Sequence, residues 1–444
     1  MSMFSNSRKW VYPLKISGRF SGYHKVSSVF LFLFLAVFPW MRWNGRPLFL
    51  ADVPARKLTI FGQLYTASDG MFIMLFALLA AFALFFFTAL FGRLWCGYAC
   101  PQSVLQLNLV LPIERWLEGD RSARLQRARE GWTFDNTWRT IAKWSLYLIF
   151  SALLSISFMG FFVPAELLWT GQASGTAYGI VAFFTALWFL DFTWFREQVC
   201  NYICPYARFQ SALTDKHSWI ISYDEPRGEP RGKAAKARGG CIDCVKCVNV
   251  CPQGIDIRNG FQLECIACGK CVDACEDVMG KLGHKTLVRY STVANDTGES
   301  HRWIRPRSVI YGALLTVISA GIVINVGLHK PLEVMVDRQP GSLFIVDQDG
   351  FVRNNFMVHV ADRTLAEGEH TYAIAVGGLP PGSQVLSQPV TLKPEQRVTV
   401  PVVVRVPNAD AKATMPITFT VRGPELELVS TTNFKGPDAA PVVE

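Results

Sequence analysis

Five long runs of apolar residues separate the polar parts of this chain. They occupy residues 26–43, 71–91, 141–163, 176–195 and 308–328. As a helix, a run of about 20 apolar residues is long enough to cross a hydrocarbon core of roughly 30 Å. The pattern therefore predicts a membrane protein with five transmembrane helices, whose two chain ends lie on opposite sides of the membrane.

After the fifth run, apolar and polar residues alternate in short stretches. Asp349-Gly350 separates the first two stretches and is typical of a hairpin turn. Several short strands with turn signals over roughly 110 residues favour an immunoglobulin-like sandwich, here without a disulfide because this region has no cysteine. The alternation predicts strands over residues 343–346, 351–360, 371–376, 390–393, 397–406 and 416–421.

The distribution of lysine and arginine predicts how the spans are oriented. Residues 1–25 carry five basic side chains and residues 92–140 carry seven, whereas residues 44–70 carry three and residues 164–175 carry none. Basic loops tend to stay in the cytoplasm. We therefore expect the N-terminus and residues 196–307 on the cytoplasmic side. All twelve cysteines then lie in the reducing compartment.

Composition agrees with a membrane protein, since half of the 444 residues are hydrophobic and 18% are charged. The net charge of +9 is unevenly divided, with +12 on residues 1–328 and −3 on residues 329–444. The positive excess lies beside the predicted spans, where it sets topology and contacts anionic lipid. We therefore expect membrane lipid as a partner and no binding of nucleic acid.

Eight cysteines form two copies of the pattern C-x-x-C-x-x-C-x-x-x-C. In ferredoxins with this spacing, three cysteines of one copy and the last cysteine of the other hold each 4Fe-4S cluster. One cluster is then expected on Cys241, Cys244, Cys247 and Cys275. The other is expected on Cys265, Cys268, Cys271 and Cys251. Pro252 follows Cys251 as the pattern expects, whereas Glu276 follows Cys275.

Zinc and disulfides are the alternatives for closely spaced cysteines. A tetrahedral zinc site needs four ligands. It does not need gaps of two, two and three residues that are repeated within 35 residues. Disulfides are rare in a reducing compartment. The spacing therefore favours two 4Fe-4S clusters as cofactors.

A second repeat, C-x-x-x-C-P, lies just after the second and fourth apolar runs. Cysteines four residues apart share a helix face, and the proline disfavours helical geometry at the second cysteine. If the helices that carry the two motifs pack together, four thiolates would converge on a site for Cu(I), zinc or another iron–sulfur cluster. Packing of cysteine as a small apolar residue is the alternative without chemistry. The four cysteines are Cys96, Cys100, Cys200 and Cys204.

These patterns predict a multi-domain membrane protein. Its parts would be a five-helix transmembrane bundle, a cytoplasmic ferredoxin-like domain with two 4Fe-4S clusters inserted between spans four and five, and a C-terminal all-β immunoglobulin-like sandwich. The expected boundaries are an N-terminal segment 1–25, a four-span region 26–205, a linker and cluster domain 206–307, a fifth helix 308–328 and an external domain 329–444.

The sequence CPQGIDIRNG from Cys251 to Gly260, followed by Gln262, Cys265 and Ile266, resembles the cytochrome c oxidase accessory proteins called CcoG, FixG or RdxA. The C-x-x-x-C-P motifs, the five spans and the β-domain extend this resemblance over nearly the whole chain. It implies a multi-pass protein of the bacterial cytoplasmic (inner) membrane. The N-terminus and clusters would be cytoplasmic and the C-terminal domain periplasmic.

The resemblance also implies an oxidoreductase that reduces Cu(II) to Cu(I) for assembly of a cbb3-type cytochrome c oxidase. The eight clustered cysteines would relay electrons from a cytoplasmic donor, and the four C-x-x-x-C-P cysteines would be catalytic and bind copper. Oxidase subunits or assembly factors are the implied partners, and a homodimer is compatible with them. Two alternatives stay open: a polyferredoxin that relays electrons between quinol and a partner oxidoreductase, and a cluster-containing scaffold for oxidase assembly.

Overall fold

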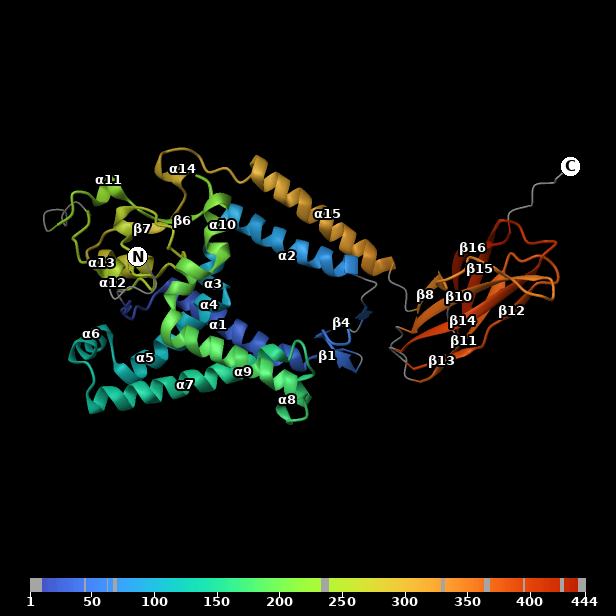
Figure 1. The fold of residues 1–444 in the computed structure, drawn as a ribbon. Helices are drawn as coiled ribbons and strands as arrows, with labels where there is room; N and C mark the ends of the chain where they lie inside the picture. The colour runs from blue at the N-terminus through green and yellow to red at the C-terminus, as the bar shows by residue number, and fades with distance from the viewer. Residues whose placement is uncertain are drawn as a thin grey trace. The chain divides into compact units, whose positions relative to one another are not determined.

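The computed structural model describes residues 10–43, 45–61, 63–66, 70–232, 239–328, 332–362, 368–393, 396–423 and 427–437. Residues 1–9 of the predicted N-terminal segment and residues 233–238 of the predicted linker lie outside these ranges. The chain divides into two compact units. The first comprises residues 1–41, 47–56 and 67–323, and the second comprises residues 42–46, 57–66 and 324–444. Figure 1 shows the elements of each.

Five helices among the described residues are long and apolar enough to cross a membrane, which confirms the predicted number of spans. They are α1 (Arg19–Val37) with a 3-10 extension (Phe38–Trp40), α2 (Gly70–Phe91), α7 (Phe134–Met159), α9 (Gly175–Leu190) with a π-helical extension η4 (Asp191–Phe195), and α15 (Pro306–Leu328). Figure 1 shows α2 beside α15. The ring of Phe85 in α2 lies 6.4 Å from that of Tyr311 in α15.

Helices α1 and α7 begin in polar sequence ahead of the predicted apolar runs. The carboxylate of Asp273 accepts hydrogen bonds from the backbone N–H groups of Phe20 and Ser21 at 3.0 and 2.7 Å, so a distant residue caps the start of α1. At α7 the hydroxyl of Thr133 accepts from the backbone N–H of Asn136. A hydropathy pattern marks only the apolar part of a helix, so it does not predict these polar first turns.

Short helices precede α7, join α7 to α9 and follow α9. Before α7 the chain forms α3 (Leu94–Tyr98), α4 (Pro101–Leu105), the π-helix η3 (Gln106–Val110), α5 (Leu111–Glu118) and α6 (Arg121–Glu130). Helix α8 (Ala165–Trp169) joins α7 to α9, and η5 (Val199–Ile203) leads into α10 (Pro205–Leu213). Cys100 and Cys204 have extended ψ angles of 122° and 112°, so each C-x-x-x-C-P motif is a break between two helices.

The cysteine-rich segment folds around a small sheet in which β6 (Ile220–Tyr223) pairs antiparallel with β7 (Val288–Ser291). Ile221, Val250, Val272 and Leu287 form its core and are at most 2% exposed. The cysteines lie in and around this apolar core. Its helices are α11 (Glu225–Gly228), α12 (Lys246–Asn249), the 3-10 helix η7 (Ile257–Asn259), α13 (Lys270–Lys281) and α14 (Val293–Asp296).

The C-terminal region contains two antiparallel sheets. One has the order β12-β14-β10-β8 with β9 paired to β10, and the other has the order β13-β11-β15-β16. Their bounds are β8 (Leu332–Arg338), β9 (Ile345–Val346), β10 (Phe351–Asp362), β11 (His370–Gly377), β12 (Gln384–Leu386), β13 (Val390–Leu392), β14 (Arg397–Pro407), β15 (Thr414–Arg422) and β16 (Glu427–Lys435). Five shorter strands lie between α1 and α2: β1 (Arg42–Trp43), β2 (Arg46–Pro47), β3 (Phe49–Asp52), β4 (Lys57–Ile60) and β5 (Gln63–Tyr65).

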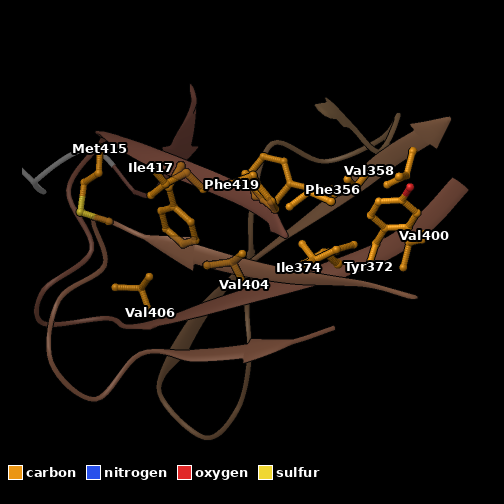
Figure 2. Close-up of a cluster of buried hydrophobic side chains, with 14 of the residues drawn as sticks. Phe356, Val358, Tyr372, Ile374, Val400, Val404, Val406, Met415, Ile417 and Phe419 are labelled. Atoms are coloured by element: carbon orange, nitrogen blue, oxygen red, sulfur yellow. The ribbon is translucent and has the colours of Figure 1, made fainter. Parts of the chain in front are cut away.

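Side chains from both sheets of the C-terminal region meet in one core, shown in Figure 2. The rings of Phe356 on β10 and Phe419 on β15 lie edge to face with centroids 5.2 Å apart. Burial alternates along β10 and β14, the period from which these strands were predicted. The sequence pattern missed the edge strands β8, β12 and β16. In β16 residues 430–433 are all polar, so the sequence shows no apolar period there although burial alternates along the strand.

Candidate metal centres

Four cysteines from both copies of the pattern line one cavity of the cluster segment. They come from the loop before α12, from α12 itself and from α13, and they are Cys241, Cys244, Cys247 and Cys275. Most of the remaining lining is apolar, including Met279 and Leu287, and Arg258 contributes a cation. The last cysteine of the second copy therefore lies with the first three cysteines of the first copy.

A second cavity is lined by Cys265, Cys268, Cys271 and Cys251. Here the last cysteine of the first copy lies with the first three of the second. Cys247 borders both cavities, so the two sites are neighbours. This exchange of the last cysteines is the arrangement that cross-ligated 4Fe-4S clusters require. The assignment of each ligand remains a prediction.

The donor set suits iron–sulfur clusters better than single metal ions. Across the described ranges, no three Cys, His, Asp or Glu side chains are grouped so that they could hold one ion. In a cubane each thiolate binds a different iron, so the sulfurs surround a group of atoms. Burial raises the pKa of Cys247 and Cys265 to about 12. Cluster binding must therefore displace their protons.

Replacing Cys251 with serine is expected to remove the same cluster as replacing Cys265, although the two residues belong to different copies. Each variant should keep about four of eight iron atoms. Their reduced forms should give the same remaining electron paramagnetic resonance signal. Cys275→Ser is the matched control, and it should leave the other signal. If Cys251→Ser and Cys275→Ser instead lost the same signal, the cross-ligated assignment would be wrong.

The structure brings the two C-x-x-x-C-P motifs together. Gln210, in the helix after the second motif, donates a hydrogen bond from Nε2 to Sγ of Cys96 at 3.1 Å. Ser103, in the helix after the first motif, has its Oγ 4.0 Å from Sγ of Cys200. Each motif therefore contacts a cysteine of the other through its following helix. The sequence predicted this convergence only on the condition that the helices carrying the two motifs pack together.

Cys96 and Cys200 are held as thiols by their surroundings. Burial, with a smaller contribution from the neighbouring Cys100, raises the pKa of both side chains to about 12. The buried guanidinium of Arg93 lowers the pKa of Cys96 and also that of Cys265, so its charge acts on both sites. A metal that binds these sulfurs must displace their protons.

The first motif packs directly on the loop that carries Cys268. A Cβ atom on Gly97 would lie only 2.7 Å from the carbonyl oxygen of Ile266 and 2.9 Å from that of Ala267. The hydroxyl of Tyr98 donates to the carbonyl of Cys268 at 3.2 Å. Cys96 also packs against an apolar cluster that contains Ile266 and Cys268. The membrane-proximal thiols and the second cluster cavity thus share one wall.

Sequence patterns missed two residues at this contact. One nitrogen of His24, its Nε2, lies 2.7 Å from the carbonyl oxygen of Cys268, and its ring stacks on Tyr98 with centroids 4.4 Å apart. The hydroxyl of Tyr290 donates to the carbonyl of Ala267 at 2.6 Å and lies 3.0 Å from that of Tyr98. A lone histidine and a lone tyrosine have no spacing signal that would have revealed them.

Three family models match the chain. One described as a 4Fe-4S dicluster domain matches residues 195–293, and one described as a 4Fe-4S binding domain matches residues 73–109. The third, an IG-like fold at the C-terminus of FixG, putative oxidoreductase, matches residues 322–437. The chain therefore carries 4Fe-4S-binding domains and a C-terminal immunoglobulin-like domain. All twelve cysteines fall within the two iron–sulfur matches.

Three curated proteins are similar to the chain over most of its length. Protein RdxB of Cereibacter sphaeroides is 35% identical over 396 residues, which cover 83% of this chain and 82% of RdxB. Protein RdxA of the same organism is 35% identical over 389 residues, with the same coverage of 83% and 82%. Nitrogen fixation protein FixG of Rhizobium meliloti is 30% identical over 422 residues, 84% of this chain and 80% of FixG.

Proposed function

The chain belongs to the FixG/RdxA family of integral membrane iron–sulfur proteins, and on this premise we propose that it reduces Cu(II) to Cu(I) at its C-x-x-x-C-P thiolates. Each turnover adds one electron to Cu(II). The Cu(I) would serve assembly of a cbb3-type cytochrome c oxidase, whose subunits or assembly factors are the proposed partners. A homodimer is compatible with this role.

The observation that supports the proposal most directly is the contact between the first motif and the Cys268 loop. Gly97 touches backbone carbonyls of that loop, and Tyr98 is hydrogen-bonded to it. When bound, the two clusters would supply one-electron carriers on the loop side of this contact. The C-x-x-x-C-P thiols lie on its other side. The protein itself supplies a short, rigid junction between two sulfur-rich sites.

The four C-x-x-x-C-P cysteines have the chemistry to favour the reduced metal. Cu(II) prefers nitrogen and oxygen ligands in tetragonal geometry, whereas soft thiolates stabilise Cu(I). The two motifs contact each other through Gln210 and Ser103, so thiolates of both motifs are the proposed ligands. The positive charge of Arg93 offsets only part of the effect of burial, which still raises the pKa of Cys96 to about 12, so copper must displace the proton of this thiol.

The proposed orientation follows from the basic residues of the short loops. It places the N-terminus, the cluster segment and an electron donor in the cytoplasm, and the immunoglobulin-like domain in the periplasm. The cysteine-rich segment between α10 and α15 would then be the cytoplasmic domain inserted before the fifth span.

Copper reduction can be tested without interference from the reductant. Purified protein is reduced anaerobically, desalted and mixed with Cu(II) and a Cu(I)-specific chelator. Two clusters store two electrons, so we expect about two Cu(I) per protein. The control is the same protein desalted with its clusters oxidised, because protein stripped of iron would expose eight further thiols that themselves reduce Cu(II). A yield no higher than that control would contradict the proposal, and cluster oxidation by a quinone analogue without copper reduction would favour the polyferredoxin alternative.

A further inference from the structure

A cavity of about 560 Å³ lies apart from the cysteines, between α5, α6, the start of α7 and the π-helix η4. Its volume lies within the usual range for small-molecule sites, roughly 300–1,000 Å³. Four tryptophans line it, together with five basic side chains. The tryptophans are Trp10, Trp132, Trp144 and Trp194, and the basic residues are Arg124, Arg127, Arg139, Lys143 and Arg196.

The cavity lies where two membrane-spanning helices end. Lys143 and Trp144 belong to the first turns of α7, and Trp194 belongs to the π-helical extension of α9. Trp132, just before α7, is 82% exposed. Tryptophan and basic side chains gather at this depth in membrane proteins, beside the lipid headgroups. The cavity is therefore placed at headgroup level.

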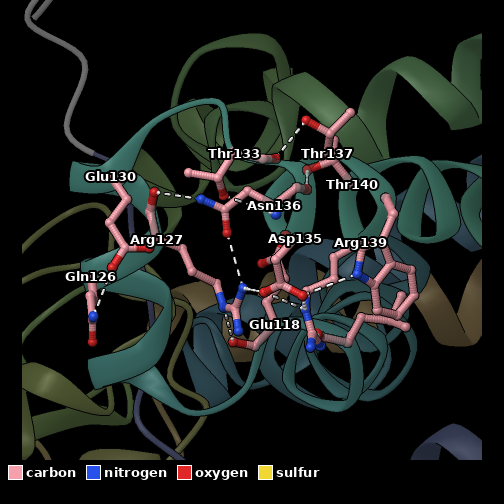
Figure 3. A network of polar contacts seen from close by, with 12 residues as sticks. Glu118, Gln126, Arg127, Glu130, Thr133, Asp135, Asn136, Thr137, Arg139 and Thr140 are labelled. Atoms are coloured by element: carbon pink, nitrogen blue, oxygen red, sulfur yellow. Dashed lines mark hydrogen bonds and ion pairs between the residues drawn. The ribbon is translucent and has the colours of Figure 1, made fainter.

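Ion pairs hold the basic side chains of the cavity in place. Arg124 pairs with Glu114 at 2.5 Å and with Glu118 at 3.4 Å, and Lys143 pairs with Glu118 at 2.5 Å. Figure 3 shows a neighbouring part of this network, in which Arg127 and Arg139 bind Asp135 at 2.5 and 2.9 Å. Arg196 pairs with Glu114 at 2.8 Å and lies 3.7 Å from Glu197.

The lining of the cavity is positively charged. Five cations line it together with two carboxylates, Glu114 and Glu118, while Asp135 and Glu197 pair with three of the cations from outside the lining. Four donor atoms of the lining are also buried without a hydrogen-bond partner: Nε and Nη1 of Arg124, Nε of Arg196 and the hydroxyl of Tyr147. Arg124 and Tyr147 are only 1% exposed. Unsatisfied buried donors are costly, and a negative charge in the cavity beside them would lower that cost.

We propose that this cavity binds the phosphate headgroup of an acidic phospholipid. The phosphate oxygens would accept from Arg139 and Lys143 and neutralise the positive charge of the lining, while the tryptophan rings would flank the glycerol and the upper acyl chains. A neutral quinol would leave the charge uncompensated. A small soluble anion would not use the aromatic lining.

The site is connected to the cluster segment by residues 10–14. The ring of Tyr12 lies under the guanidinium of Arg124, 4.8 Å from its centre, and that of Trp10 lies 5.7 Å from Arg196. Two residues after Tyr12, the N–H of Leu14 donates to the carbonyl of Asn249 in α12 at 2.8 Å. A bound headgroup would restrict the motion of residues 10–14 and so help to position the cluster segment at the membrane surface.

The test uses delipidated full-length protein in detergent, titrated with single lipids and followed by native mass spectrometry. We expect phosphatidylglycerol to bind at least about tenfold more tightly than phosphatidylcholine. The double variant Arg139→Gln/Lys143→Gln should lose about tenfold in affinity for phosphatidylglycerol. The charge-conserving variant Arg139→Lys/Lys143→Arg should retain it. Unchanged cluster absorption and melting temperature will show that each variant is folded.

Lys216→Gln/Lys281→Gln is the matched control. It removes two cations from exposed ion pairs in the first unit, at side chains 54% and 73% exposed, and should bind phosphatidylglycerol like the wild type. Inorganic phosphate and glycerol phosphate at the same concentrations should not compete. The proposal would be overturned by equal binding of phosphatidylcholine or by full competition from free phosphate. It would also be overturned if ubiquinone displaced the lipid, or if Arg139→Gln/Lys143→Gln bound phosphatidylglycerol with wild-type affinity.

Discussion

Replacing both Cys96 and Cys200 with serine is expected to abolish copper reduction while leaving the iron content unchanged. These two sulfurs carry the contacts that join the motifs, to Gln210 and Ser103. Serine is nearly isosteric but is a hard oxygen ligand that does not stabilise Cu(I). The yield of Cu(I) should therefore fall to that of protein whose clusters were left oxidised. The measurements are chelator-detected Cu(I), bound copper, iron and acid-labile sulfide.

The reciprocal variant, Cys244→Ser, separates the two kinds of site. Cys244 lines only the first cluster cavity, so this variant should lose about four irons and still bind copper. The alternative reading of the C-x-x-x-C-P motifs makes a different prediction. If wild-type protein contains twelve irons and Cys96→Ser/Cys200→Ser contains eight, then the four thiolates hold a third cluster and the copper proposal is wrong.

Replacing Gly97 with alanine, which removes no cysteine, is expected to slow copper reduction by about 10²-fold. The added Cβ would lie 2.7 and 2.9 Å from two carbonyl oxygens, closer than carbon and oxygen can pack. Both oxygens belong to the backbone, so the Cys268 loop must move away from the motif. Electron transfer depends steeply on separation, which makes this junction sensitive to a small displacement.

The experiment mixes pre-reduced protein with Cu(II) and follows the bleached cluster absorption as it recovers. In Gly97→Ala the reduced clusters should form normally with a chemical reductant and then persist. The matched controls are Gly179→Ala in α9 and Gly280→Ala in α13, where an added Cβ has nothing within 4 Å. They should behave as wild type. A wild-type rate in Gly97→Ala would show that electrons do not cross this contact.

Much of the fold and part of the site could be predicted because the relevant signals are local. Each span needs about 20 successive apolar residues, and all five are found. The long central strands β10 and β14 follow a period of two, whereas the edge strand β16 has four polar residues in a row, 430–433, and was missed. Helix starts depended on caps, and the cap of α1 is Asp273, far along the chain.

The sequence by itself determined which residues can act: twelve thiols in two spacings, five spans and a β-rich C-terminal region. Ligand spacing and hydropathy are properties of neighbouring residues, so they can be read without a fold. Only the tertiary structure decided that Gln210 reaches Cys96, that Gly97 rests on the Cys268 loop and that a charged cavity forms beside α7. These contacts join residues far apart in sequence, and close packing of the helices, not any local pattern, brings them together.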